Sequence, residues 1–225
     1  MARTETAFLF DLDGTLIDSV YDHVLAWHEA LVSEGIELSI WRIHRRIGMS
    51  GGLFTNMLAR ETGTEMSAER LDRLRQKHAE AYNSRSHGIR PLPGARELLA
   101  WLTDAEIPWA IATSGRMETA GPVLDTLGVD RSKVPVVTRD MVKYAKPDPD
   151  LFLAAADKLG VPIENSCVVG DSIWDLLAAR RARALGIGLL SGGYGEDELS
   201  KAGAYRVYED PADLLLHIDE VGGRR

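Results

Sequence analysis

Asp11 and Asp13 stand one residue apart, immediately after a short apolar run at residues 7–10. Two carboxylates at this spacing repel each other, so their placement is costly unless a bound cation or a proton-transfer role offsets the repulsion. Gly14 follows them, and the plainer alternative is a solvated turn in which the glycine supplies the backbone angle. We favour the first interpretation, which predicts metal-binding or acid–base chemistry at this point of the chain.

Asp171 and Asp175 form a second acidic segment after the apolar residues 167–169. Gly170 is expected to make a turn there, so that Asp171 heads a helix and Asp175 lies one helical turn later, at i+4. Ordinary alternatives exist for both residues, because an aspartate often caps a helix start and a helix face is often solvated. We therefore assign this segment a functional role only in combination with the first acidic pair.

Hydroxyl groups end one further apolar run, and a cation precedes one of the helical patterns. Thr113 and Ser114 end an apolar run, where their hydroxyls and the nearby backbone amides could donate hydrogen bonds to phosphoryl oxygens. Lys146 stands just before a helical pattern, and an ammonium held near Asp11 would offset the charge that develops in phosphoryl transfer. Each signal is weak alone, since a single lysine is more often solvated at the surface.

The elements that position these side chains alternate between strand and helix. Short apolar runs typical of buried strands occupy residues 7–10, 109–112, 134–137, 167–169 and 186–190. Helical patterns occupy residues 94–104, 116–127, 148–159, 172–184 and 210–218. This alternation predicts an α/β fold built from β-α-β units, with a parallel sheet covered by helices on both faces. Such open sheets bind ligands beyond the carboxyl ends of their strands, where the acidic and hydroxyl segments lie.

Residues 17–89 interrupt this alternation, because a run of helical patterns rather than a second strand follows the first strand. Two prolines within residues 90–94 predict a stiff linker that returns the chain to the sheet. The sequence thus predicts a discontinuous core, residues 1–16 and 90–225, and an inserted α-helical cap at residues 17–89.

The composition narrows the classes of partner. The 225 residues carry 26 Lys+Arg against 34 Asp+Glu, a net charge of -8 with no basic run, so we expect neither a nucleic acid nor a membrane as partner. The single cysteine, Cys167, cannot form an internal disulfide, which fits the reducing cytoplasm. It lies in an apolar run, so we expect it to be buried. We find no secretory or membrane-spanning apolar stretch and expect a cytoplasmic protein that binds a small molecule.

In this order, each at a strand end, the segments resemble the motifs of the haloacid dehalogenase superfamily, in particular its phosphatases with a helical cap after the first motif. The matching residues are 11–19, Thr113 with Ser114, Lys146 with Pro147, and 170–175. The resemblance covers nearly the whole chain. It implies a Rossmann-like, doubly wound core and a Mg²⁺-dependent phosphatase of small phosphorylated metabolites, with phosphoglycolate and sugar phosphates as natural candidates.

The resemblance also implies a role for each matched position. Asp11 would attack phosphorus and form an aspartyl-phosphate, while Asp13 would protonate the leaving alcohol and later deprotonate the attacking water. An Asp11 oxygen, the Asp13 backbone carbonyl and Asp171 would bind Mg²⁺, with Asp175 supporting them from outside the direct ligands. The groups that hold the phosphoryl oxygens would be Thr113, the backbone amides near Ser114, and Lys146.

A phosphomutase of the β-phosphoglucomutase type is the main alternative, because such enzymes share these motifs and the cap. They carry an arginine in a cap loop to bind the distal phosphate, whereas this chain has Gly51 in that neighbourhood, which leaves water as the expected phosphoryl acceptor. A related mutase histidine helps to position the acid–base aspartate, and His23 stands near that place, although a helix histidine is more often a plain surface residue. The candidate substrate contacts of this mobile cap loop are Arg45, Gly48, Ser50 and Gly51.

Three other chemistries are disfavoured. Asp13 argues against dehalogenation, since the dehalogenases of this superfamily expel a halide and lack that aspartate. Phosphonate cleavage needs a cap lysine, and Lys77 lies in a charged stretch that indicates a solvated face. A phospho-accepting signalling domain also uses an aspartate, hydroxyls and a lysine, but it has neither the insertion nor the acidic segment at residues 170–175. We expect a monomer or a homodimer.

Overall fold

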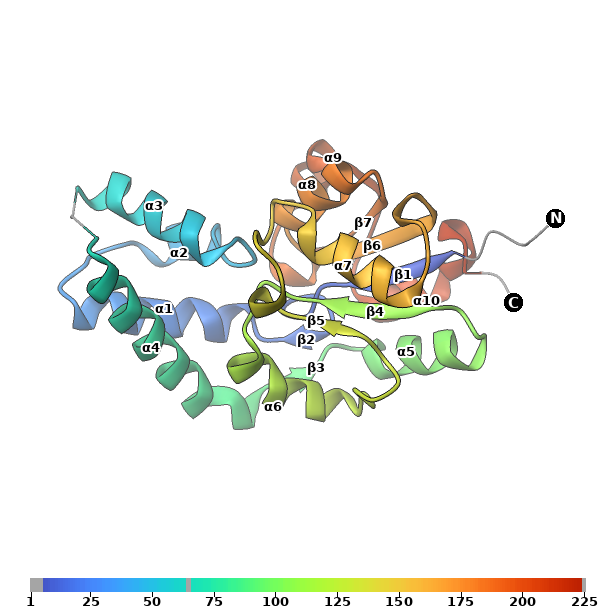
Figure 1. Cartoon of the computed structure of the whole chain (residues 1–225), viewed down its shortest axis with the longest axis horizontal. Coiled ribbons are helices and arrows are strands. Elements are labelled where there is room, and N and C mark those ends of the chain that lie inside the picture. The colour runs from blue at the N-terminus through green and yellow to red at the C-terminus, as the bar shows by residue number, and fades with distance from the viewer. Residues whose placement is uncertain (1–5, 64–65, 224–225) are drawn as a thin grey trace.

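The computed structural model describes residues 6–63 and 66–223 of the chain. Its main strands are β1 (Ala7–Phe10), β4 (Trp109–Ala112), β5 (Val136–Val137), β6 (Ser166–Gly170), β7 (Leu185–Leu189) and β8 (Ala204–Tyr208). These strands form one sheet in the order β5-β4-β1-β6-β7-β8, and every neighbouring pair is parallel (Figure 1). The predicted α/β fold with a parallel sheet is confirmed.

Helices cover both faces of this sheet. They are α5 (Ala95–Asp104), α6 (Met117–Leu127), α7 (Asp150–Leu159), α8 (Ile173–Ala182), α9 (Glu196–Ala202) and α10 (Pro211–Leu216), with the 3-10 turns η2 (Arg139–Met141), η3 (Ile163–Asn165), η4 (Leu190–Gly192) and η5 (Ile218–Val221). Alternate side chains of β1 divide the core, because Phe8 and Phe10 pack with α5, α6 and α10, whereas Leu9 packs with α7 and α8. This alternation explains why the whole of β1 is apolar and buried.

The register of the central strands fixes the place of the acidic segments. β1 pairs with β4 on one side and β6 on the other, so that Phe10 aligns with Ile111 and with Val169. The residues that follow parallel strands emerge at one edge of the sheet. Asp11 and Asp171, which come directly after β1 and β6, therefore emerge side by side.

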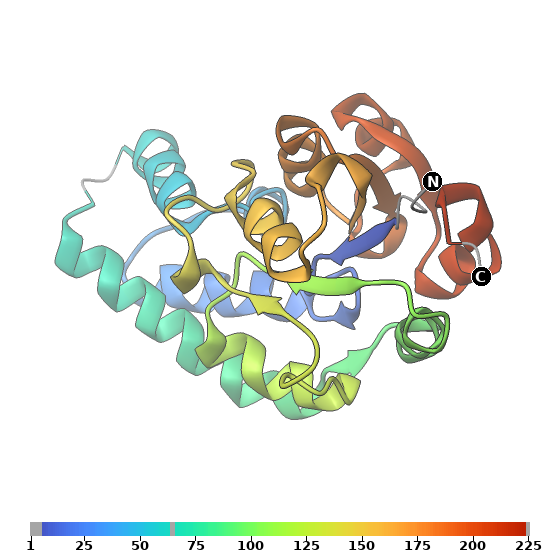
Figure 2. The same cartoon turned by 45° about the vertical axis from the view of Figure 1, so that its right-hand side comes forward.

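Four helices lie beside the sheet instead of on it (Figures 1 and 2). They are α1 (Val20–Ser33), α2 (Ile40–His44), α3 (Gly51–Thr62) and α4 (Ala68–Arg85), followed by the turn η1 (Ser86–Gly88). They enclose an apolar cluster of their own, which includes Val24, Leu31, Ile43, Phe54, Leu58 and Leu74. The chain leaves for these helices through β2 (Ile17–Asp18) and returns through β3 (Arg90–Pro91), which pair antiparallel.

The helices predicted around the sheet form within two residues of their expected bounds. Neither α9 nor β8 was predicted from the sequence. β8 is an edge strand that exposes Tyr205 and Arg206, so it lacks the continuous apolar run of the buried strands. Arg183 ends α8 in the left-handed conformation, at φ 66°. No helix within the described residues is both long and apolar enough to cross a membrane.

Candidate active site

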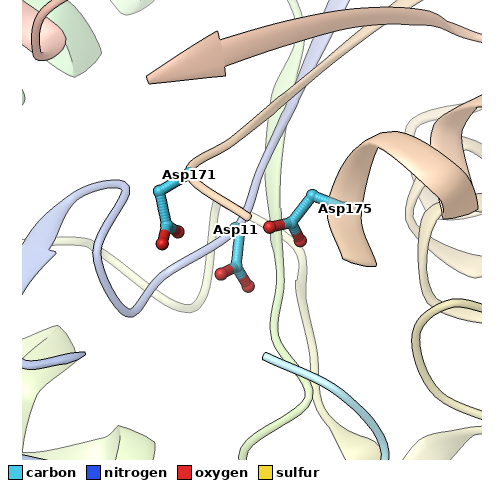
Figure 3. A group of neighbouring side chains, drawn as sticks. All are labelled: Asp11, Asp171 and Asp175. Carbon is cyan, nitrogen blue, oxygen red and sulfur yellow. The ribbon is translucent and has the colours of Figure 1, made fainter. Parts of the chain in front are cut away.

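Three carboxylates meet at the carboxyl edge of the sheet. Asp11 follows β1, Asp171 follows β6, and Asp175 lies in the first turn of α8. Their exposed fractions are 3%, 4% and 0%, and one oxygen of each lies within 4.8 Å of the others (Figure 3). Asp175 is therefore part of a buried acidic group and does not lie on a solvated helix face.

Lys146 supplies a buried cation to this group. Its side chain is fully buried, and Nζ forms an ion pair with Asp11 Oδ1 and a second one, at 2.7 Å, with Asp175 Oδ1. Burial alone would lower the pKa of Lys146, but the two carboxylates outweigh burial and raise this pKa above its usual range. The ammonium consequently stays charged beside Asp11 at neutral pH.

Asp175 is held in place by the start of its own helix. Its Oδ2 accepts hydrogen bonds from the Ser172 amide at 3.1 Å and from the Ser172 hydroxyl at 2.5 Å, as in a capping box. The strand end must be glycine, because a Cβ at Gly170 would lie 2.3 Å from the Cβ of Asp175. With Oδ1 on Lys146, both oxygens of Asp175 are engaged, so this residue orients the lysine and the turn.

Asp171 has fewer partners in the protein. Its Oδ1 accepts a hydrogen bond from the Thr15 hydroxyl at 2.9 Å. Two glycines make room for the other oxygen, because a Cβ at Gly14 would lie 2.5 Å from Oδ2 and one at Gly192 only 1.7 Å from it. Burial first, and then the neighbouring carboxylates, raise the pKa of Asp171 well above its usual range. The positive charge that the protein places near Asp171 is therefore too small to offset the burial of its ionised carboxylate.

The donor set fits a divalent cation such as Mg²⁺. Burial raises the pKa of Asp11 to about 7 against the opposing charge of Lys146, and the nearby carboxylates add to the rise. A hard cation bound by oxygen ligands would offset this crowding of like charges. Asp11 and Asp171 have carboxylate oxygens close enough to share an ion, whereas the oxygens of Asp175 are already engaged.

Asp13 is held by partners at the start of the inserted helices. Its Oδ1 accepts a hydrogen bond from the Ser19 hydroxyl at 2.6 Å and lies 3.2 Å from His23 Nε2. Burial alone would raise the pKa of Asp13, but the His23 and Ser19 contacts outweigh burial and lower this pKa. Both contacts are made by Oδ1, and Oδ2 lies near Gly115, where an added Cβ would be 3.9 Å from it.

Thr113 and Ser114 follow β4 at the same edge of the sheet. The Thr113 amide donates to the Val137 carbonyl at 2.9 Å, and the Thr113 hydroxyl accepts from the Gly115 amide at 2.9 Å. The Ser114 hydroxyl donates to the Gly48 carbonyl at 2.8 Å. The serine hydroxyl therefore joins the core to residues 17–89.

A cavity of about 600 Å³ lies between the sheet edge and the inserted helices. Its walls include Asp11, Asp13, Thr113 and Ser114 on the core side and Trp27, Arg46, Gly48, Gly51, Phe54 and His78 on the helical side. Ser50 is not among its lining residues. Instead, the Ser50 amide donates to the Lys146 carbonyl at 2.8 Å, and the Ser50 hydroxyl accepts from the Leu53 amide at the start of α3.

Arg45 also lies away from the cavity wall. Its guanidinium pairs with Glu198 of α9 and covers the Tyr194 ring at 4.0 Å, so it connects the inserted helices to the core. Its neighbour Arg46 lines the cavity and pairs with Glu61 of α3. Neither Arg46 nor His78 was predicted as a site residue, because helical patterns do not tell which residue at the end of α2, or which turn of α4, faces the cavity.

Comparison with known proteins gives matches over most of the chain. Residues 5–183 match the model of a family described as haloacid dehalogenase-like hydrolase. Hexitol phosphatase A of Escherichia coli (strain K12) is 36% identical over 167 residues, which are 73% of this chain and 74% of that protein. A phosphoglycolate phosphatase of Agrobacterium fabrum is 31% identical over 186 residues, 82% of this chain and 80% of that protein. The crystal structure of a hydrolase from Pseudomonas syringae is 58% identical, with a TM-score of 0.94 and coverage of 96% of this chain and 99% of that one.

Proposed function

Because the chain belongs to the haloacid dehalogenase-like hydrolases, we propose that this site cleaves phosphate monoesters through an aspartyl-phosphate on Asp11. The chain is a phosphoric monoester hydrolase that acts on small phosphorylated metabolites. One observation carries the proposed chemistry: the buried carboxylate of Asp11 is paired with Lys146 and lines the same cavity as Asp13. The proposed nucleophile and the proposed acid–base group thus line one cavity, and a fixed cation is paired with the nucleophile.

In the first half-reaction, an Asp11 oxygen forms a bond to phosphorus while the bond between phosphorus and the substrate alcohol breaks. Lys146 lies against Asp11 and carries the positive charge that stabilises the phosphoryl oxygens as they gain charge. Asp13 gives a proton to the departing oxygen, so that a neutral alcohol leaves. Thr113 and the backbone amides near Ser114 complete the hold on the phosphoryl group.

Asp13 has to carry a proton in the first half-reaction and accept one in the second. The His23 and Ser19 contacts lower the pKa of Asp13, so the free site holds a carboxylate there. An incoming phosphate monoester brings negative charge, which raises the proton affinity of Asp13. After the alcohol leaves, the Asp13 carboxylate takes a proton from water, the water oxygen bonds to phosphorus, and Asp11 is released. The free oxygen for both transfers is Oδ2.

Mg²⁺ would be held by an Asp11 oxygen, by Asp171 and by the backbone carbonyl of Asp13. When bound, the ion would withdraw charge from the phosphoryl oxygens and offset the repulsion among the carboxylates. Asp175 would support this arrangement from outside the direct ligands, since its oxygens hold Lys146 and the Ser172 turn.

We propose that residues 17–89 act as a cap over a core formed by residues 1–16 and 90–225. The paired strands β2 and β3 are the two connections between these parts, which suits a hinge. The hydrogen bond from Ser114 to Gly48 joins the two parts across the cavity. A cavity of about 600 Å³ has room for phosphoglycolate or a sugar phosphate.

A sugar-phosphate mutase is the alternative that would use the same nucleophile. In the resembling mutases, a cap arginine holds the distal phosphate, whereas Gly51 lines the cavity here. Arg46 also lines the cavity, but Glu61 balances its charge. The two relatives described above are named phosphatases. These observations favour water over a second phosphate ester as the phosphoryl acceptor.

The direct test is phosphate release from a panel of phosphorylated metabolites, measured with Mg²⁺ and with a chelator. The panel includes phosphoglycolate, hexitol phosphates and a sugar 1-phosphate whose isomerisation is followed in parallel. We expect metal-dependent release with a preferred ester. Isomerisation without release would establish the mutase instead, and a stable phosphorylated Asp11 without turnover would indicate a signalling domain.

The nucleophile is tested by Asp11→Asn, with Asp157→Asn on the exposed surface of α7 as the matched control. The first change should abolish turnover and the formation of a phosphorylated protein, because an amide is a poor nucleophile for phosphorus. The control should behave as the wild type. Turnover above a trace level in Asp11→Asn would remove Asp11 from the proposed role.

A further inference from the structure

Two imidazoles connect the far helix of the cap to the acid–base aspartate. His23 of α1 lies with Nε2 at 3.2 Å from Asp13 Oδ1 and with Nδ1 at 3.1 Å from Nε2 of His78. His78 belongs to α4, which follows α1 by more than thirty residues and packs along it. The line of contacts therefore runs from α4 through α1 to the sheet edge.

We propose that His78 is a positioning residue, which donates a hydrogen bond to His23 and thereby fixes the tautomer and the orientation in which His23 donates to Asp13. The proposal rests on the acid–base role of Asp13 proposed above. His78 itself touches neither Asp13 nor, in the mechanism above, the reacting atoms, so it acts through His23.

Hydrogen-bond accounting supports this direction of donation. A neutral imidazole carries hydrogen on one nitrogen and a lone pair on the other. If a neutral His23 donated from Nδ1 to His78, its Nε2 lone pair would face the carboxylate of Asp13 at 3.2 Å, which is repulsive. If His78 donates from Nε2, His23 keeps its hydrogen on Nε2 and both contacts are satisfied.

The surroundings of His78 suit a neutral donor. Its ring stacks on Trp27 with 4.3 Å between the ring centroids, and burial lowers the pKa of His78 well below its usual range. A ring that stays neutral has one N–H to place, and the Nδ1 of His23 lies within its reach.

The plane of the His23 ring is also fixed. Tyr82, one turn after His78 on α4, stacks on His23 at 3.8 Å between centroids with an interplanar angle of 3°. The fully buried Tyr82 prevents the ring from tilting, while the hydrogen bond from His78 determines which nitrogen faces Asp13. Two residues of α4 therefore fix the ring plane and the tautomer of His23, which contacts Asp13.

The test compares His78→Phe, His78→Gln and the control His87→Phe in the intact, Mg²⁺-loaded enzyme. Phenylalanine keeps an aromatic ring for stacking on Trp27 but removes the donor, whereas glutamine keeps an N–H donor. His87 lies exposed in η1. We expect His78→Phe to lower kcat roughly tenfold with little change in KM, because a misplaced acid–base group slows proton transfer without weakening substrate binding. His78→Gln should recover much of that loss, and His87→Phe should equal the wild type.

A spectroscopic measurement separates positioning from simple packing. In protein with ¹⁵N-labelled histidine, the His23 signals should show hydrogen on Nε2 and none on Nδ1 in the wild type and in His78→Gln. In His78→Phe we expect the His23 ring to turn over within its plane, so that either nitrogen can face Asp13 and carry the hydrogen, which is then distributed over both nitrogens. The inference is overturned by an unchanged kcat in His78→Phe, by an unchanged His23 tautomer despite a lost kcat, or by hydrogen on both His23 nitrogens in the wild type.

The same measurements distinguish a failure of this inference from a failure of the proposed function. If the wild type released no phosphate from any compound of the panel, the phosphatase proposal would fail by itself. The His23 tautomer is read without turnover, so the contact between His78 and His23 is still tested in that case.

Discussion

Replacing Lys146 by methionine probes the charge balance of the site. Methionine has a side chain of similar length, so the change removes the ammonium with little loss of packing. In the wild type this ammonium is fully buried and pairs with Asp11 and with Asp175, the latter at 2.7 Å. In Lys146→Met, two buried carboxylates would face each other without that cation.

The size of the effect follows from this burial. Removing one partner of a buried ion pair costs about 3–5 kcal/mol, because the other charge remains without compensation. For a chain of this length, each 1 kcal/mol lowers Tm by roughly 2–4 °C, so we expect a fall of roughly 6–20 °C with chelator present. Lys133→Met is the matched control. Lys133 is 80% exposed and lies 3.4 Å from Asp130, and an exposed pair contributes at most about 1 kcal/mol.

The assay is thermal unfolding followed by circular dichroism, with EDTA present, for both methionine variants, Asp175→Asn and the double variant Lys146→Met with Asp175→Asn. The double variant should regain part of the stability lost in Lys146→Met, because it removes one of the two uncompensated charges. The reasoning is refuted if Lys146→Met unfolds at the same temperature as the Lys133→Met control.

Three further predictions concern other positions. Asp171→Asn should raise Tm of the chelated protein by a few degrees and abolish the rise that Mg²⁺ causes in the wild type, because it removes a charge that burial disfavours; thermal unfolding with and without Mg²⁺ checks both effects. Burial raises the pKa of Cys167 to about 12, so iodoacetamide at pH 8 should label this thiol only after unfolding; rapid labelling of the native protein would contradict its burial. Arg183→Gly should stabilise the protein by about 1 kcal/mol, since φ at this residue is 66°, and an unchanged urea midpoint would count against that account.

Local patterning was enough to predict the main sheet. Apolar runs and helical patterns predicted β1, β4, β6 and β7 and the helices between them, because a parallel sheet buried on both faces requires continuous apolar strands. The same logic failed at the edge. β8 exposes Tyr205 and Arg206, and among the described residues it pairs with β7 alone, so its sequence lacks the apolar run of a buried strand.

The candidate site was predictable where strand ends determine position. Asp11, Thr113 and Asp171 each follow a strand of one parallel sheet, so the sequence order of strand and polar residue suffices to place them at one edge. Asp175 and Lys146 were assigned by resemblance, and the structure adds that both are fully buried and paired with each other.

The contacts that the inserted helices make with the sheet edge and with one another depend on packing that the local sequence does not encode. Arg45 and Arg46 are adjacent, yet Arg45 pairs with Glu198 of α9 whereas Arg46 lines the cavity, because the two side chains leave the end of α2 in different directions. The contact between His23 and His78 joins residues 55 positions apart in the sequence.

The sequence by itself determined which polar groups meet at the sheet edge, since residues that follow neighbouring strands come together whenever those strands pair in parallel. Only the tertiary structure decided which side chains of the inserted helices reach this edge. The direction of each side chain on these helices depends on how α1, α2 and α4 pack against one another and against the core. This packing depends on how the side chains of distant segments fit together, and a local pattern in the sequence does not contain that information.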